Sequence, residues 1–292
     1  MANLKEIRGR IVSVNSTKQI TSAMKMVSAA KLKRAQDAVV QTRPYANKLS
    51  EILSNLTATL DASENKFAHE REVKNVLVIA ITSNRGLCGG FNNNVLKASN
   101  KLIKDYEGKC NVAVLCIGKK ATDFYKGSNY NIKASDFPKH LNEIFDHLTF
   151  DESSKIAVNI MNHYLDRSID KVYLVYNKFK NAGVQELMTE QFLPILPPKN
   201  ATTNSKVEYI FEPGKKKILE DLIPKSLKLQ FFKALLDSFA SEHGARMTAM
   251  HKATDNATEL LKDLRLTYNK ARQAAITNEI LEIVGGAEAL NA

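Results

Sequence analysis

The segment SNRGLCGGFN, Ser83–Asn92, has the composition in this chain that best suits chemistry. It follows a β-branched run and precedes a helical pattern, the position at which glycine-rich loops of α/β proteins cradle phosphate with backbone N–H groups. The segment matches neither GxGxxG nor GxxxxGK[ST], and Leu87 and Cys88 make its centre apolar. We therefore favour a structural turn between a strand and a helix, with phosphate binding as the alternative.

The other side chains capable of chemistry do not form a recognisable site. The 6 histidines show no HExxH or paired ligand spacing, which favours structural roles over metal binding. Cys110 and Cys116 flank one strand-like run, and six residues of strand span roughly 20 Å, beyond the reach of a disulfide. We expect reduced thiols, no metal, no cofactor and no catalytic residue. A small nucleotide-binding α/β enzyme is kept as an alternative function.

Positive charge is concentrated near the N-terminus of this chain, whose formal net charge is +11. Residues 1–60 contain ten Lys or Arg against three acidic residues, whereas residues 215–292 contain twelve against ten. A basic helix suits DNA or an anionic surface. Here, however, basic residues alternate with Met24 and its apolar neighbours without a clean polar side, which favours a helix contacted all round by protein. A basic coiled-coil nucleic-acid protein is a further alternative, and we expect no nucleic acid.

Both ends of the chain show helical periodicity. Apolar residues recur at helical spacing over residues 4–60, and Pro44 is expected to kink or break this helix near Arg43. After Pro224, the chain runs to Val284 with only Gly244 as a weak breaker, so a helix of about 60 residues could reach roughly 90 Å. Ten of its positions follow three and four spacings, the signature of a coiled-coil seam: Leu236, Phe239, His243, Met250, Ala253, Ala257, Leu260, Leu264, Ala271 and Ala274.

The middle of the chain has the alternation typical of an α/β domain. Strand-like runs over 75–83, 111–118, 171–179 and 184–195 alternate with helical segments at 91–106, near Ala121 and at Asn142–Leu165, and EYIFEP at 208–213 closes the domain. The predicted fold is therefore a long antiparallel coiled coil of the terminal helices with an inserted open, Rossmann-like α/β domain. The predicted domains are 1–60, 73–213 and 214–292.

The sequence shows no secretory signal and no membrane-spanning segment. The opening MANLKEIRGR lacks the apolar core of a secretory signal, and no run of about 18 apolar residues occurs. We expect a cytoplasmic location and no membrane span.

Four separated segments resemble the gamma subunits of F-type ATP synthases, of the bacterial type. They are QITSAMKMVSAAKLKRAQ at 19–36, RGLCGGFN at 85–92, ARMTAMHKATDNA at 245–257 and YNKARQAAITNEILEIVGGAEAL at 268–290. The similarity runs through the whole chain in order and is weakest over 107–206. Asn84 departs from the family pattern, which commonly has Asp before the Arg-Gly-Leu run.

This resemblance implies a noncatalytic rotor shaft. The coiled coil would stand inside a ring of alternating alpha and beta subunits, and the α/β domain would sit on the membrane c-ring. Rotation would present different faces to the beta subunits and couple ion flow to ATP synthesis or hydrolysis. The epsilon and delta subunits are further implied partners. The chain would be peripheral, at the cytoplasmic face of the cell inner membrane.

Particular residues acquire roles from the resemblance alone. Met24, Arg272 and Gln273 would contact the beta subunits, with Met24 approaching Arg272. Glu212 would lie near the c-ring and the epsilon subunit. The end of the long helix would occupy an apolar bearing in the catalytic head, through Leu281, Ile283, Val284 and Leu290.

Overall fold

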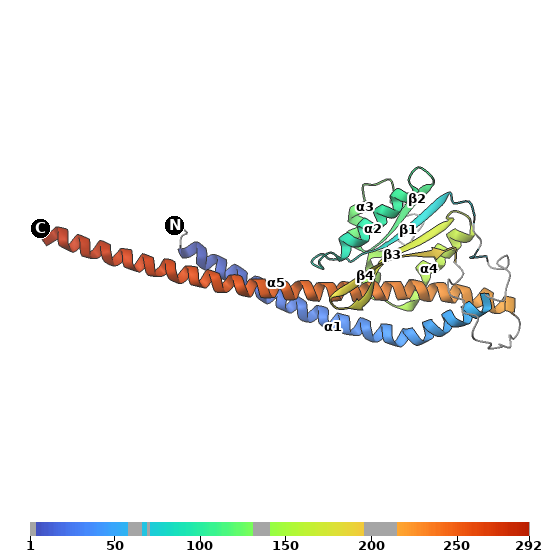
Figure 1. Cartoon of the computed structure of the whole chain (residues 1–292), viewed down its shortest axis with the longest axis horizontal. Helices are drawn as coiled ribbons and strands as arrows, with labels where there is room; N and C mark the ends of the chain where they lie inside the picture. The colour runs from blue at the N-terminus through green and yellow to red at the C-terminus, as the bar shows by residue number, and fades with distance from the viewer. Residues whose placement is uncertain (1–3, 58–65, 69–70, 131–140, 196–214, 292) are drawn as a thin grey trace. The chain divides into compact units, whose positions relative to one another are not determined.

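The computed structural model describes residues 4–57, 66–68, 71–130, 141–195 and 215–291. The chain divides into two compact units (Figure 1). Unit 1 comprises residues 1–28 and 247–292, and unit 2 comprises residues 29–246. The three predicted domain boundaries remain a prediction, and the segment EYIFEP lies outside the described residues.

Unit 2 contains a four-stranded sheet with the strand order β2-β1-β3-β4. The strands are β1 (Asn75–Ile81), β2 (Asn111–Ile117), β3 (Lys171–Asn181) and β4 (Val184–Leu193). The central strand β1 pairs in parallel with both β2 and β3, whereas β4 pairs antiparallel with β3. A parallel central strand is covered on both faces, which explains why β1 is a continuous apolar run. The predicted α/β class is confirmed.

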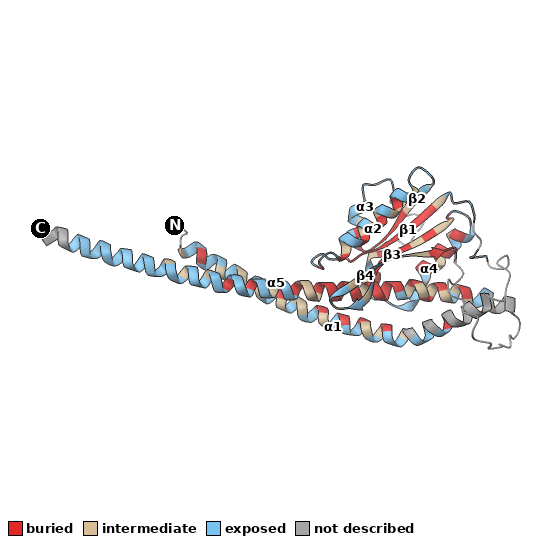
Figure 2. Ribbon diagram, viewed as in Figure 1, coloured by how far each residue is buried: buried red, intermediate tan, exposed pale blue. Residues whose placement is uncertain are grey.

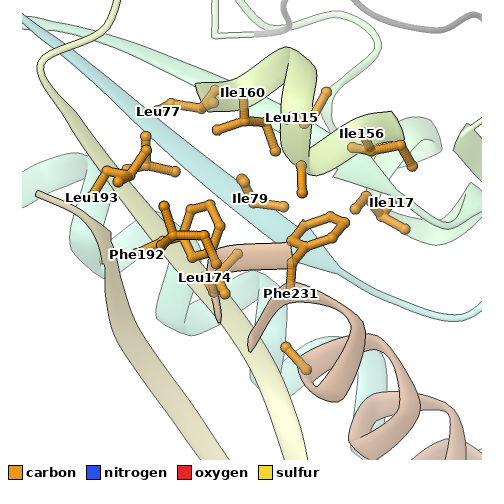
Figure 3. Close-up of a cluster of buried hydrophobic side chains, with 14 of the residues drawn as sticks. Leu77, Ile79, Leu115, Ile117, Ile156, Ile160, Leu174, Phe192, Leu193 and Phe231 are labelled. Atoms are coloured by element: carbon orange, nitrogen blue, oxygen red, sulfur yellow. The ribbon is translucent and has the colours of Figure 1, made fainter. Parts of the chain in front are cut away.

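The two faces of the sheet bury two separate hydrophobic clusters. Alternate residues of β1 point to opposite faces, so Leu77 and Ile79 enter one cluster while Val76 and Val78 enter the other. The first cluster is covered by α4 (Phe150–Leu165) and by part of α5 (Lys215–Asn291), as Figure 3 shows. The second is covered by α2 (Phe91–Tyr106) and α3 (Lys119–Tyr125). The helix α5 is thus part of the core of unit 2.

The helix predicted at Asn142–Leu165 is wrong at its start. Leu141–Phe145 forms the 3₁₀ helix η2, and α4 begins only at Phe150. The Thr149 hydroxyl accepts a hydrogen bond from the backbone N–H of Glu152 at 3.3 Å, which caps the new helix. A threonine N-cap satisfies one of the free N–H groups of a first helical turn, and so it separates two helical segments that share one apolar pattern.

Each of the two long helices contains a proline. The helix α1 extends over Leu4–Thr57 with Pro44 inside, and α5 extends over Lys215–Asn291 with Pro224 inside. An interior proline costs about 3 kcal/mol. Around Pro224 this cost is offset because Ile223 and Leu227 are buried in the sheet core, where each large apolar side chain contributes about 1.5–3 kcal/mol. Helix α1 therefore continues past Arg43 without the break that was one of the two expected effects of Pro44, and α5 begins nine residues before Pro224.

Within unit 1, α1 and α5 form the predicted antiparallel coiled coil (Figure 1). The hydroxyls of Thr21 and Thr254 lie 2.8 Å apart and define its register. Buried or half-buried residues recur on both helices at alternating spacings of four and three, the coiled-coil pattern. They are Ile7, Ile11, Val14, Lys18, Thr21, Lys25 and Ser28 on α1, and Met250, Thr254, Ala257, Leu261, Leu264, Tyr268 and Ala271 on α5.

Three residues of the predicted seam are wrong, and the first is Ala253, because the adjacent Thr254 continues the pattern. Leu260 is 48% exposed, whereas its neighbour Leu261 is only 5% exposed and occupies the seam. Ala274 is exposed because the register places Leu4, the first described residue of α1, opposite about Ala271. Two adjacent leucines satisfy the same periodic pattern, and only the partner helix distinguishes them.

Candidate functional site

The loop Ser83–Asn92 is closed by its own side chains. The Asn92 carboxamide oxygen accepts from the Ser83 backbone N–H at 2.9 Å, and its NH₂ group donates to the Ser83 hydroxyl at 2.8 Å and to Cys88 Sγ at 3.2 Å. The Ser83 hydroxyl donates to the Arg85 carbonyl at 2.7 Å. The side chains of Ser83 and Asn92 and the backbone N–H of Ser83 are thus bonded within the loop. This geometry supports the structural turn.

A buried charge pair on α5 holds the same loop. Arg246 donates from Nη1 to Glu242 Oε1 at 2.5 Å, and from Nη2 to the carbonyls of Arg85 at 2.9 Å and Gly86 at 3.2 Å. Both charged side chains are buried. Burial raises the pKa of Glu242, and the Arg246 guanidinium beside it opposes that rise. The loop is therefore attached to a helix that follows it by about 160 residues in the chain.

The tip of the loop points outward. Leu87 has a backbone φ of 63° and is 66% exposed, although it is apolar. A positive φ is strained for a leucine, and such strain persists where the surrounding structure enforces it. Arg85 is also exposed. Its carbonyl oxygen, rather than its guanidinium, takes part in the hydrogen bond with Arg246. The loop thus presents Leu87 and the Arg85 side chain to the surroundings.

Asn84 makes two bonds that depend on its amide. Its carboxamide oxygen accepts from the Lys119 backbone N–H at 3.0 Å, and its NH₂ group donates to the Asn142 carbonyl at 2.6 Å. An aspartate could make the first bond but carries no donor for the second. In this chain, asparagine therefore fits a position where the family pattern commonly has aspartate.

Burial governs the chemistry of His243 and of two of the cysteines. His243 is buried with its ring edge-on to Phe239 at 4.6 Å, and burial lowers its pKa to about 3, with Arg246 and Lys31 adding to the shift. All three cysteines are free. Burial raises the pKa of Cys88 and raises that of Cys116 to about 12, which leaves both thiols poor nucleophiles. In the described part of the chain, no three His, Cys, Asp or Glu side chains form a metal-sized cluster.

The residues predicted to contact a partner lie at different heights along the coiled coil of unit 1. Met24 is half-buried one turn from Thr21, whereas Arg272 and Gln273 are exposed on α5. Arg272 follows Thr254 by eighteen residues, about 27 Å of helix. The expectation that Met24 approaches Arg272 is therefore wrong, because the antiparallel register carries the two residues apart.

The predicted bearing residues lie on the part of α5 that has no described α1 residue beside it. Figure 2 shows this end of the helix exposed on all sides. Leu281, Ile283 and Val284 are 62%, 68% and 51% exposed, and Ile276 and Ile280 add two further exposed apolar side chains. The side chain of Leu290 and the whole of Glu212 lie outside the described residues.

A basic groove between α1 and α5 in unit 1 was not predicted from the sequence. Its volume is about 330 Å³. Three cations line it, Lys18 from α1 and Lys262 and Arg265 from α5, above apolar side chains that include Leu261. The spacing of Lys262 and Arg265 places them on one helix face beside Leu261, but only the correct seam residue would have revealed the groove.

Comparisons with known proteins agree over the full length of the chain. Residues 3–290 match the family model described as ATP synthase. The ATP synthase gamma chain of Christiangramia forsetii is 60% identical, and that of Flavobacterium johnsoniae is 61% identical, each over 100% of both chains. A chain in the cryo-EM structure of Euglena gracilis mitochondrial ATP synthase, OSCP/F1/c-ring, is 25% identical with a TM-score of 0.65, covering 98% of this chain and 94% of that one. No described helix is long and apolar enough to cross a membrane.

Proposed function

This chain belongs to the ATP synthase gamma chain family, a family of noncatalytic central-stalk subunits, and from that premise we propose how its parts perform rotary coupling. The coiled coil of unit 1 turns inside a ring of alpha and beta subunits. The sheet of unit 2 belongs to the end of the stalk that meets the membrane c-ring and the epsilon subunit. Ion flow through the ring is thereby linked to ATP synthesis or hydrolysis in the catalytic head.

The exposed end of α5 is the single observation that carries this proposal. From Arg272 to Ala287 every residue is exposed, and five of them are large and apolar. Contiguous apolar surface of this kind marks a site that a partner covers. At 3.6 residues per turn these apolar residues fall within about half of the helix circumference, a broad stripe that a curved apolar surface of a partner would cover. An apolar collar formed by the alpha and beta subunits has the required form, and Leu281, Ile283, Val284 and Leu290 are its proposed contacts.

Contacts at two heights account for coupling between the shaft and the catalytic subunits. We place Met24 at a lower contact with beta, and Arg272 and Gln273 at a higher one roughly 30 Å along the helix. The two helices differ in sequence, so each angular position presents a different surface to each beta subunit. Differential contact of this kind shifts the nucleotide affinity of each beta subunit.

The remaining assignments follow from membership of the family. Glu212 is proposed to lie near the c-ring and the epsilon subunit, and delta completes the set of partners. The chain is proposed to be peripheral, at the cytoplasmic face of the cell inner membrane. The proposal assigns no catalytic residue to this chain.

The test is affinity purification of the tagged full-length chain from its native cell. The expected result is an ATP-hydrolysing complex that contains alpha and beta subunits in excess over this chain. A double variant, Ile280→Asp with Ile283→Asp, should reduce recovery of alpha and beta because two charges would enter the apolar collar. Glu279→Asp, a substitution on the same turn that keeps the charge, should not. Recovery of the chain without alpha and beta would refute the proposal.

A further inference from the structure

The buried ion pair of Glu242 and Arg246 also makes hydrogen bonds to the loop Ser83–Asn92. Glu242 engages Nη1 of Arg246, which leaves Nη2 directed at the carbonyls of Arg85 and Gly86. The guanidinium is planar, so fixing one nitrogen also fixes the direction in which the other donates. Glu242 therefore orients Arg246 toward the loop Ser83–Asn92.

Stability alone does not explain a buried charge pair at this position. Both side chains are more than nine-tenths buried, and removing two charges from water costs about as much as their attraction returns. Two apolar side chains of similar size would serve the packing equally well. They would, however, provide no donor for the Arg85 and Gly86 carbonyls, which is the one property that the charge pair adds.

The pair lies at the last turn of α5 that belongs to unit 2. Gly244 approaches the β3–β4 hairpin so closely that an added Cβ would lie 3.3 Å from Ala182 Cα. Ala245 packs with Cys88 and Phe91 in a small buried cluster. Arg246 follows directly, and unit 2 ends at that residue. Because α5 continues from this turn into unit 1, the contacts of this turn and of those before it join the sheet directly to the continuing helix.

We propose that Arg246, oriented by Glu242, is a positioning residue for rotary coupling that clamps the loop Ser83–Asn92 to α5. This inference rests on the proposed rotor function. With the clamp in place, the exposed tip at Leu87 keeps a fixed angle relative to α5, and turning force passes between the sheet domain and the shaft without slip. With the clamp removed, the chain still assembles and ATP is still hydrolysed, but part of each rotation is lost.

The first measurement is hydrogen exchange of the purified full-length chain. Arg246→Met keeps an unbranched side chain but removes the donors, so the amides of residues 85–90 should exchange about tenfold faster, as expected for losing hydrogen bonds to a charged group. Arg246→Lys should fall between Arg246→Met and the wild type. The exposed Lys252→Met, on the same helix, should match the wild type. Unchanged exchange in Arg246→Met would overturn the clamp.

The second measurement is ATP-driven ion pumping, normalised to hydrolysis, in inverted vesicles from cells that carry each variant. Arg246→Met should pump at most about half as many ions per ATP as the wild type, and Arg246→Lys should recover most of the difference. The exchanged pair Glu242→Arg with Arg246→Glu keeps opposite charges but places a carboxylate before the carbonyls, so it should behave like Arg246→Met. Wild-type pumping in the exchanged pair, or faster exchange with unchanged pumping in Arg246→Met, would overturn the coupling role.

The two proposals fail in different ways. If the wild-type chain does not assemble with alpha and beta, the rotor function is refuted. The hydrogen-exchange experiment on the purified chain still tests whether Arg246 holds the loop Ser83–Asn92. If the wild type assembles and pumps, and Arg246→Met does so equally well per ATP, only the positioning role is refuted.

Discussion

Several side chains in unit 2 make hydrogen bonds to residues that are far away in the sequence. Arg246 reaches the carbonyls of residues 85 and 86, and Asn84 joins the backbone of Lys119 to that of Asn142. The planar guanidinium of arginine donates to a carboxylate and to two carbonyls in fixed directions, and the amide of asparagine both donates and accepts. The identity of these residues is therefore explained by the tertiary hydrogen bonds that they make, and not by a catalytic role.

His243 should make the stability of the chain depend on pH. Its pKa is about 3 in the folded chain, chiefly because of burial and further because of Arg246 and Lys31, whereas in the unfolded chain it is about 6.5. Between these values only the unfolded chain binds the proton, so stability falls as the pH falls below 6.5. The slope from this one group is at most about 1.4 kcal/mol per pH unit.

Urea unfolding followed by circular dichroism between pH 7 and pH 5 measures this dependence. His243→Gln should lose less stability than the wild type over this range, because glutamine does not titrate. His251→Gln, at an exposed residue paired with Asp255, serves as the control. Glu242, whose pKa is raised by burial, is present in all three proteins and so largely cancels in the comparison. Equal pH dependence in His243→Gln and the wild type would contradict the assignment.

The long helices are stabilised along their length by different partners. In unit 2, α5 contributes Phe231 and Leu235 to the sheet core, so that part of the helix is an element of an α/β fold. In unit 1, the same helix offers alanine and threonine at the seam, which permits close approach to α1. One continuous helix therefore meets two packing environments with two residue patterns.

The seam register is tested by two adjacent leucines. Leu261→Ala removes a side chain that is 5% exposed, so it should destabilise unit 1 by about 2–4 kcal/mol. Leu260→Ala changes a side chain that is 48% exposed and should cost no more than about 0.5 kcal/mol. Thermal unfolding followed by helical circular dichroism compares them. A greater loss from Leu260→Ala would mean that the register set by Thr21 and Thr254 is wrong.

At the scale of the whole molecule, the two units differ in how far their backbone amides are protected from solvent. The sheet of unit 2 has core clusters on both faces, whereas the coiled coil of unit 1 buries a single seam and its α5 residues 272–287 are all exposed. Exposed helix opens at lower free energy than a buried strand. We therefore expect the coiled coil to gain stability from partners.

Hydrogen exchange on the isolated full-length chain should reveal this difference. Residues 1–40 and 245–292 should exchange well before Val76–Ile81 and Val172–Tyr176, because the strands lie in the buried core. In the assembled complex, residues 272–287 should become protected. Uniform protection throughout the isolated chain would show that the coiled coil is stable without partners.

Much of this protein was predictable from local sequence pattern. The period-3.6 runs at the two ends, the alternation of β-branched and helical segments between them, and the turn at Ser83–Asn92 each follow from interactions within a few residues, and each is present in the structure. The four segments that resemble the gamma subunits of F-type ATP synthases indicated the family, and the exposed bearing residues fit that resemblance.

Only the tertiary structure decided the features that depend on distant partners. Pro224 remains helical where Ile223 and Leu227 are buried in the sheet core, and Leu261 rather than Leu260 occupies the seam because α1 lies on that side. Met24 and Arg272 are apart because the helices are antiparallel in the register of Thr21 and Thr254. Arg246 meets a loop about 160 residues earlier in the chain. A periodic pattern indicates which face of a helix is apolar, but it does not indicate which distant group packs against that face. That pairing determines the register of the coiled coil, the basic groove between α1 and α5, and the contact of Arg246 with the loop Ser83–Asn92.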